Sequence, residues 1–142
     1  MPPHRASIID RSVEKAHVWL NELTAGLGTE DRQSAYRVLR AVLHAVRERL
    51  TVDEAAQLAA QSPELIRGIY YEGWDPSRTP ASYHDRRPFL DRIAAEGALA
   101  GESEASFAAE AVMDVVRRHI SAGEYEQVLH ALPRPVRAVV RT

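Results

Sequence analysis

The sequence contains no cysteine, and this absence excludes disulfide bonds, thiolate metal sites and cysteine nucleophiles. It also suits a reducing compartment, so we expect a cytoplasmic protein. No run of apolar residues approaches the roughly 18 that a membrane-spanning helix needs. The opening MPPHRASIIDRS also lacks the apolar segment of a secretory signal peptide. We therefore expect no membrane contact.

Lysine is almost absent, since Lys15 is the single lysine among 18 basic residues. The 20 acidic residues leave a net charge of −2, and neither half of the chain has the basic excess that is typical of nucleic-acid binding. We therefore expect no nucleic-acid partner. The abundance of arginine favours a codon bias of a GC-rich genome over an arginine-based recognition surface.

The sequence aligns with itself without a gap when it is shifted by 70 residues. Trp19-Leu20 then falls on Phe89-Leu90, and Pro63 falls on Pro133. Because capping residues and prolines match as well as alanines, we interpret the pattern as an internal duplication. It predicts one repeat over 13–72 and a second over 83–142, joined by a loop over 73–88.

The spacing of apolar residues predicts four helices in the first repeat. Thr29 is expected to cap the second helix, Thr51 with Glu54 forms a capping box for the third, and Ser62 caps the fourth with Pro63 at its first position. The apolar stripe of the first helix is Val13, Ala16, Leu20, Leu23 and Leu27. That of the second is Tyr36, Leu39, Val42, Leu43, Val46 and Leu50.

The second repeat follows the same order, with Ser121 and Glu124 as a second capping box. No stretch alternates long enough to predict a strand. An alanine-rich unit of about 70 residues makes only a thin core by itself. We therefore predict an all-α fold of about eight helices, in which two pseudo-symmetric four-helix repeats pack as one compact bundle over 1–142.

Three segments resemble a known protein family. They are VLRAVLHAVRERLTVDEAAQLAAQSPELIRGIYYEGW from Val38 to Trp74, PFLDRI from Pro88 to Ile93, and HISAGEYEQVLHALP from His119 to Pro133. Together they are similar to the bacterial family called domain of unknown function 2267, over roughly 13–140. The resemblance implies a small helical bacterial protein. It carries no activity and no catalytic residue to this chain.

The sequence contains few motifs that are associated with catalysis or with metal or phosphate binding. His44 and Glu48 stand one helical turn apart and could form a two-ligand metal face, although a solvated polar stripe explains them better. The chain has no His-Glu-x-x-His motif, no Walker loop and no Gly-x-Ser-x-Gly elbow. We expect no metal, no cofactor and no catalytic residue. An enzyme that uses Glu72, His84 and Asp85 as acid and base stays an open alternative.

Two pairs of arginines occupy matching positions in the repeats, namely Arg47 with Arg117 and Arg67 with Arg137. We expect them to form ion pairs with Glu54 and Glu124 that hold the capping corners in place. The alternative is a pair of anion-binding points presented to a partner.

The loop between the repeats gathers residues that are suited to a binding site. The candidates are Tyr71, Glu72, Trp74, Asp75, Tyr83, His84, Asp85 and Arg86. Trp74 could simply cover the apolar end of the first repeat, and this structural interpretation is the preferred one. The other interpretation is a pocket at the junction of the repeats, because aromatic and carboxylate side chains that converge at such a junction often bind ligands.

These observations favour a non-enzymatic cytoplasmic protein-interaction module that binds another protein or its own copy. The alternative is a small-ligand or metal-binding protein that uses the aromatic and acidic loop between the repeats.

Overall fold

The computed structural model describes residues 7–140, which form eight α-helices and one short 3-10 helix. The first half comprises α1 (Ile8–Leu27), α2 (Arg32–Glu48), α3 (Val52–Ala60) and α4 (Glu64–Tyr71). The 3-10 helix η2 (Pro76–Arg78) follows, and then α5 (Arg86–Gly97), α6 (Glu102–His119), α7 (Ala122–Ala131) and α8 (Arg134–Val140). Within 7–140 there is no strand. The predicted all-α fold is confirmed.

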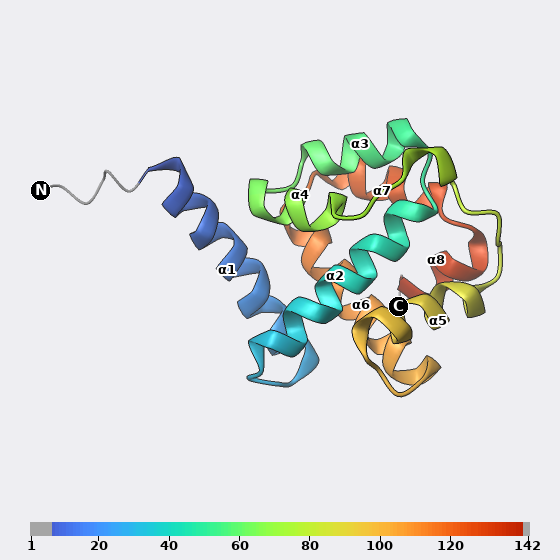
Figure 1. The fold of residues 1–142 in the computed structure, drawn as a ribbon, viewed down its shortest axis with the longest axis horizontal. Helices are drawn as coiled ribbons and strands as arrows, with labels where there is room; N and C mark the ends of the chain where they lie inside the picture. Colours follow the sequence, from blue (N-terminus) through green and yellow to red (C-terminus); the bar gives the residue numbers. More distant parts are fainter. Residues whose placement is uncertain (1–6, 141–142) are drawn as a thin grey trace, which may run out of the picture.

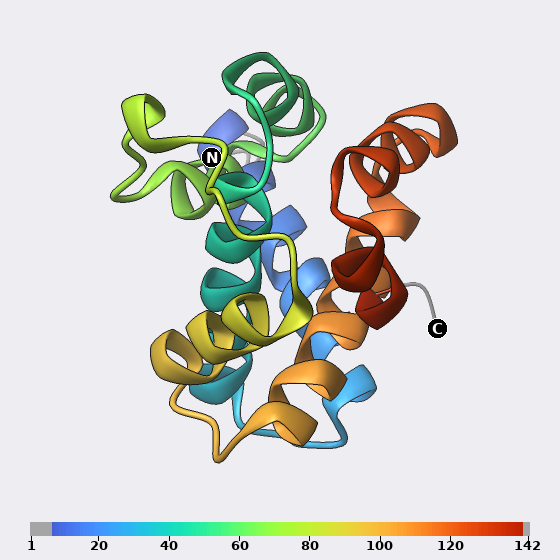
Figure 2. The ribbon, with the colours of Figure 1, turned by 90° about the vertical axis from the view of Figure 1, so that its right-hand side faces the viewer.

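The long helices α2 and α6 form the centre of the bundle. Figure 2 shows α2 with α3 and α4 on one side of the molecule, and α6 with α7 and α8 on the other. Both α1 and α5 pack against α2 and α6, and α3 contacts α7 across the top of the molecule (Figure 1). The halves therefore share one core, and the predicted compact packing is confirmed.

That core is built from apolar side chains of every helix. Its largest buried members include Trp19, Tyr70 and Phe89, each at most 1% exposed. Two residues that were predicted in the apolar stripes lie at its edge instead. Val13 is 37% exposed and Tyr36 is 38% exposed, because the buried face of each helix carries the neighbouring residue at that point, Ser12 in α1 and Ala35 in α2. Tyr70 was predicted as a core residue and is one.

Two predicted caps shift by one or two residues. The cap of α2 is Asp31, whose carboxylate accepts hydrogen bonds from the backbone N–H groups of Gln33 and Ser34, while Thr29 accepts one from Asp31. The cap position of α4 is Pro63, because the hydroxyl of Ser62 turns back and donates to the carbonyl of Leu58. A carboxylate competes well for backbone donors, which explains why Asp31 replaces Thr29.

The two predicted capping boxes also differ. Thr51 and Glu54 exchange both hydrogen bonds at the start of α3. At α7, Ser121 accepts a bond from the N–H of Glu124, but the N–H of Ser121 donates to Oε1 of Gln61 at 2.8 Å. A side chain from the first half of the chain therefore completes the cap of a helix in the second half.

Equivalent helices in the two halves begin at the shift that the sequence suggests. Arg32 and Glu102, Val52 and Ala122, and Glu64 and Arg134 are the first residues of three helix pairs, and each pair is 70 positions apart. α1 and α5 also end in the same backbone conformation. Gly28 (φ 72°) follows α1, and Ala98 (φ 56°) follows α5. The internal duplication itself stays a prediction.

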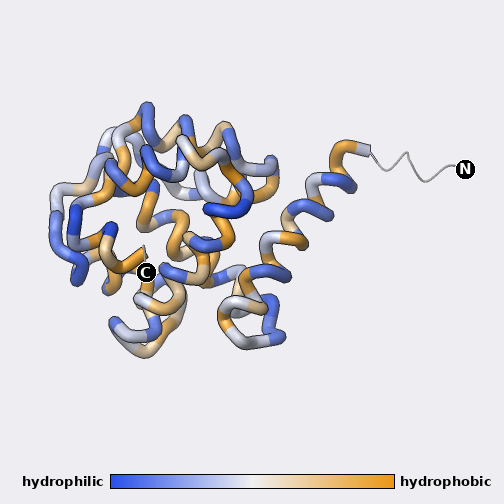
Figure 3. The backbone as a smooth tube through the Cα atoms, turned by 180° about the vertical axis from the view of Figure 1, so that it is seen from behind, coloured by the Kyte–Doolittle hydropathy of each residue, from blue (hydrophilic) through white to orange (hydrophobic). Residues whose placement is uncertain are grey.

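α1 is longer than α5, with 20 residues against 12. Its N-terminal turns project beyond the rest of the bundle (Figure 1). Figure 3 shows hydrophobic residues at the tip of this helix, followed by alternating hydrophilic and hydrophobic ones. Ile8 is 66% exposed and Ile9 is 73% exposed, whereas Ala16, Trp19 and Leu23 on the following turns are buried.

The ion pairs expected of the matched arginines do not form. Arg67 donates instead to the carbonyl oxygens of Ala59 (2.9 Å) and Ser62 (3.0 Å). A guanidinium satisfies carbonyl groups at the end of a helix well, so the backbone at the corner between α3 and α4 competes successfully with Glu54.

Arg67 and Arg137 behave alike, whereas Arg47 and Arg117 differ. Arg137 makes the same type of contact as Arg67, because it donates to Leu129 (2.8 Å) and Leu132 (3.1 Å) rather than to Glu124. Arg47 is buried and donates to the carbonyls of Tyr70 and Glu72, both at 2.7 Å. Its counterpart Arg117 is exposed on α6.

Candidate functional site

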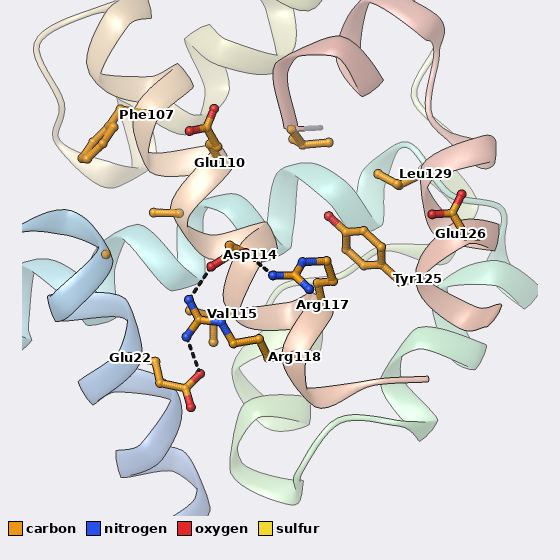
Figure 4. Close-up of a pocket in the computed structure, with 13 residues that line it drawn as sticks. Glu22, Phe107, Glu110, Asp114, Val115, Arg117, Arg118, Tyr125, Glu126 and Leu129 are labelled. Carbon is orange, nitrogen blue, oxygen red and sulfur yellow. Dashed lines mark hydrogen bonds and ion pairs between the residues drawn. The ribbon is translucent and has the colours of Figure 1, made fainter. Parts of the chain in front are cut away.

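A cleft of about 510 Å³ opens between α1, α6, α7 and the end of α8. Figure 4 shows side chains from α6 along its length, with Glu22 of α1 on one side and Tyr125, Glu126 and Leu129 of α7 on the other. A smaller groove of about 460 Å³ runs beside it between α5 and α6, and the two share Phe107 and Glu110. Phe107 is 53% exposed, which is unusual for a large aromatic side chain.

A chain of ion pairs crosses this cleft. Asp114 accepts hydrogen bonds from Arg117 (2.6 Å) and from Arg118, and Arg118 also reaches Glu22 of α1 at 3.2 Å (Figure 4). The hydrogen bond from Arg117 and that from Arg118 hold the pKa of Asp114 below its usual range. Glu22 further contacts Nε2 of His119 at 2.9 Å. The cations at the centre of the cleft are therefore neutralised by neighbouring side chains.

The remaining surface of the cleft is apolar at its floor and acidic at its rim. Val115, Leu129 and Val140 are buried residues that form part of the floor. Four carboxylate side chains line the cleft against two guanidiniums, which gives it a net negative charge. The lining holds no His, Ser, Thr or Lys. This composition suits non-covalent binding of a segment that combines apolar and basic side chains.

Sequence reasoning missed this cleft because its lining comes from helices at both ends of the chain. One signal was present. Under the shift of 70 residues, Phe107 falls on Arg37, so an aromatic residue stands where the other half has a cation. Where one repeat has a charged residue on the polar face of a helix and the other repeat has an apolar one, the apolar residue is expected to be an exposed contact point.

The structure brings part of the predicted loop site together. The rings of Tyr71 and Trp74 lie 5.2 Å apart and pack against the core. Glu72 is exposed and forms an ion pair with Arg40 of α2 at 2.6 Å, and this hydrogen bond lowers the pKa of Glu72. Asp75 caps η2 by accepting hydrogen bonds from Ser77.

The other predicted loop residues lie further along the chain. Tyr83 is half-buried below the guanidinium of Arg49, whose carbon atom lies 5.2 Å from the ring centroid. His84 and Asp85 are exposed, and Arg86 lines the groove between α5 and α6. Within 7–140, no hydrogen bond or ion pair joins Glu72, His84 and Asp85. The predicted ligand or partner site at this loop stays a prediction.

His44 and Glu48, the pair considered for a metal, are both engaged by other groups. His44 is 3% exposed, with Nε2 2.8 Å from the carbonyl of Ile69 and Nδ1 2.6 Å from Glu96. Burial lowers the pKa of His44. Glu48 forms a two-pronged ion pair with Arg92 at 2.6 and 2.7 Å. In the described part of the chain there is no group of three residues suited to hold a metal ion.

Four buried polar atoms have no hydrogen-bond partner within 7–140. They are Nε of Arg47, Nε of Arg49, Nε1 of Trp74 and the hydroxyl of Tyr83. Such atoms are rare in folded proteins, because each one costs the free energy of removing it from water. All four belong to the C-terminal end of α2 and to the loop between α4 and α5.

Comparison with protein families gives one match. The sequence model of the family described as "Uncharacterized conserved protein (DUF2267)" matches residues 16–139. The chain belongs to this family. The match confirms the family that the three sequence segments resemble. It covers most of α1, all of α2 to α7, and α8 except its last residue.

The curated proteins that were compared contain no match to the chain. Membership of the DUF2267 family therefore brings no activity and no binding residue to the site. Among the helices of residues 7–140, none is long and apolar enough to cross a lipid bilayer.

Proposed function

We propose that this member of the DUF2267 family is a non-enzymatic, cytoplasmic protein-interaction module, and that the cleft between α1, α6, α7 and α8 is its contact surface. The observation that carries the proposal is Phe107, which is 53% exposed at the junction of the cleft and the neighbouring groove. An exposed aromatic ring beside an apolar floor is a typical anchor in protein interfaces.

The charges of the cleft indicate the kind of partner. Because carboxylates outnumber guanidiniums in the lining, a segment with basic side chains beside one or two apolar ones fits best. Arg117 and Arg118 already have carboxylate partners, so an acidic ligand would have to displace Asp114 or Glu22. The partner is another protein or a second copy of this chain.

The test uses a photo-reactive phenylalanine analogue in place of Phe107, so that a bound partner is captured in the cells that make the protein. The captured partner is then purified, and its affinity for the unmodified chain is measured by isothermal titration calorimetry. We expect Phe107→Ala to weaken binding by about tenfold or more, since anchors of this kind contribute at least ~1.4 kcal/mol.

The matched control is Leu65→Ala. Leu65 is an exposed apolar residue on α4, 44% accessible, and it does not line the cleft. The Leu65→Ala variant should leave the affinity for the captured partner unchanged. Equal affinities for Phe107→Ala and the unmodified chain would contradict the proposal, whatever partner is captured.

A second candidate function is small-ligand binding at the loop between α4 and α5. The observation that favours it is the set of buried polar atoms without partners in this loop and in the adjacent end of α2. Native mass spectrometry of the purified chain distinguishes the two candidates, because a carried small molecule and a bound protein differ greatly in mass.

A further inference from the structure

Arg49 is a buried cation that has no counter-ion among the described residues. It follows α2 directly and is only 8% exposed. Its guanidinium lies over the ring of Tyr83 at 5.2 Å, and its Nε atom is buried without a hydrogen-bond partner. Within 7–140, its side chain makes no ion pair and donates no hydrogen bond.

Three arginines of α2 and α5 do have carboxylate partners. The ion pairs are Arg40 with Glu72 and Glu96, Arg92 with Glu48 and Glu96, and Arg47 with Glu48, at distances from 2.6 to 3.5 Å. Three glutamates thus neutralise three guanidiniums, whereas Arg49 forms no ion pair with a residue of 7–140. One additional negative charge would balance the group.

An unpaired guanidinium is costly in a buried position. Arginine keeps its proton at any ordinary pH, so it cannot relieve the cost by becoming neutral. The ring of Tyr83 offsets part of it through a cation–π contact. The hydroxyl of Tyr83 is itself buried without a partner, and burial raises the pKa of Tyr83 to about 12, so this hydroxyl is a neutral hydrogen-bond donor at neutral pH.

The loop between α4 and α5 is held close to this pair of residues. The N–H of Ala81 donates to the carbonyl of Glu48 at 2.6 Å, which fixes the loop against the last turn of α2. Tyr83 follows two residues later. Arg49 and Tyr83 are therefore positioned by a rigid helix end and by a backbone contact, as a preorganised binding site requires.

We propose that Arg49, with the hydroxyl of Tyr83, binds an oxyanion, namely the carboxylate or phosphate group of a small ligand. A guanidinium offers two parallel N–H donors to either group. The proposal deepens the small-ligand candidate, and it is independent of partner binding at the cleft. It adds Arg49 to the loop residues that the sequence suggested.

The experiment measures the unfolding temperature of the full chain in sodium phosphate, sodium acetate and sodium chloride at equal ionic strength and pH 7. We expect phosphate or acetate to raise it by roughly 3 °C or more over chloride at saturation. A response to phosphate alone assigns the site to a phosphate group, and a response to acetate assigns it to a carboxylate.

The Arg49→Met variant isolates the site from general salt effects, which act on every variant alike. It should lose the anion-dependent rise. In chloride it should be at least as stable as the unmodified chain, because it removes an uncompensated charge. The control Arg78→Met removes an exposed arginine of η2, 85% accessible, and should keep the full response. Tyr83→Phe keeps the ring and should reduce the response.

An equal response of Arg49→Met and the unmodified chain would overturn the proposal, and so would the absence of any response to both anions. If Arg49→Met does not fold, isothermal titration of phosphate and acetate into the unmodified chain and into Tyr83→Phe decides the question. The proposed site of Arg49 and Tyr83 is overturned if no heat of binding is detected. It is also overturned if the unmodified chain and Tyr83→Phe bind the anions with the same affinity.

Discussion

Arg67 and Arg137 stand 70 positions apart and donate hydrogen bonds to matching carbonyl groups. The acceptors of Arg67 are Ala59 and Ser62, and those of Arg137 are Leu129 and Leu132, again 70 positions apart. Both the donor and its acceptors recur at the shift of 70 residues, and this supports the proposed internal duplication. An experimental structure in which residues 16–70 fail to superpose on 86–140 would contradict that proposal.

Replacing either arginine by methionine should have a similar cost. Arg67→Met removes two charge-assisted bonds and Arg137→Met removes three, and both leave helix-end carbonyls unsatisfied. Each variant should therefore lower the free energy of unfolding by about 1–3 kcal/mol. Denaturation in guanidinium chloride measures this. Arg134→Met, at an exposed position of α8, is the control with little expected effect. An effect of Arg67→Met no larger than the control would show that these bonds are not stabilising.

Ala98→Gly should stabilise the protein. Ala98 adopts φ 56°, a left-handed conformation that disfavours residues with a side chain, whereas the matching position after α1 is Gly28. We expect the free energy of unfolding to rise by about 1 kcal/mol, measured by urea denaturation. Ala95→Gly, at an exposed position within α5, should have the opposite sign because glycine is unfavourable inside a helix.

Glu124→Gln should change the pH dependence of stability. Burial raises the pKa of Glu124, and the neighbouring charge of Glu54 acts in the same direction. The unfolded chain therefore releases the proton at a lower pH than the folded chain does. The ionised carboxylate then destabilises the folded protein above its raised pKa, and the penalty disappears as the pH falls toward the ordinary value of 4.5.

The glutamine variant lacks this titration. Its unfolding temperature should exceed that of the unmodified chain at pH 7, and the difference should vanish near pH 4. Differential scanning calorimetry at the two pH values provides the measurement, with pH 4 as the internal control. A lower unfolding temperature of Glu124→Gln at pH 7 would mean that the carboxylate has a stabilising partner.

Trp74→Phe should be tolerated far better than Trp74→Ala. The ring of Trp74 packs on Tyr71 and on the core, but its Nε1–H donates no hydrogen bond within the described residues. Phenylalanine keeps most of the packing, so its cost should stay below about 1 kcal/mol against about 2–3 kcal/mol for alanine. In Trp74→Phe, the fluorescence of the buried Trp19 follows unfolding. Equal costs for both variants would indicate that Nε1–H has an acceptor in solution.

The sequence predicted the helices well because their signals are local. The stripe around Leu39 and Val46, the capping box of Thr51 and Glu54, and the shift of 70 residues all depend on short-range spacing. The prediction failed where two acceptors compete for one donor. Nothing in the spacing says that Arg67 prefers a carbonyl to Glu54, or that Gln61 replaces Glu124 at the cap of α7.

Local sequence patterns could not predict the cleft, because its residues are far apart in the sequence. Glu22 and Arg118 are separated by 96 positions in the sequence, and only the packing of α1 on α6 brings them together. The composition of the loop between α4 and α5 predicted a candidate binding site there. The loop's most unusual partner, Arg49, directly follows α2 and carries no signal of burial in the sequence.

The bond between Gln61 and Ser121 has a consequence for how the molecule comes apart. Because the first turn of α7 takes its acceptor from the corner after α3, melting of the first half leaves the N–H of Ser121 to water and removes this contact from α7. Both halves also contribute to one apolar core. The chain should therefore unfold in a single cooperative step, with coincident transitions for signals from Trp19 and from the helices of the second half.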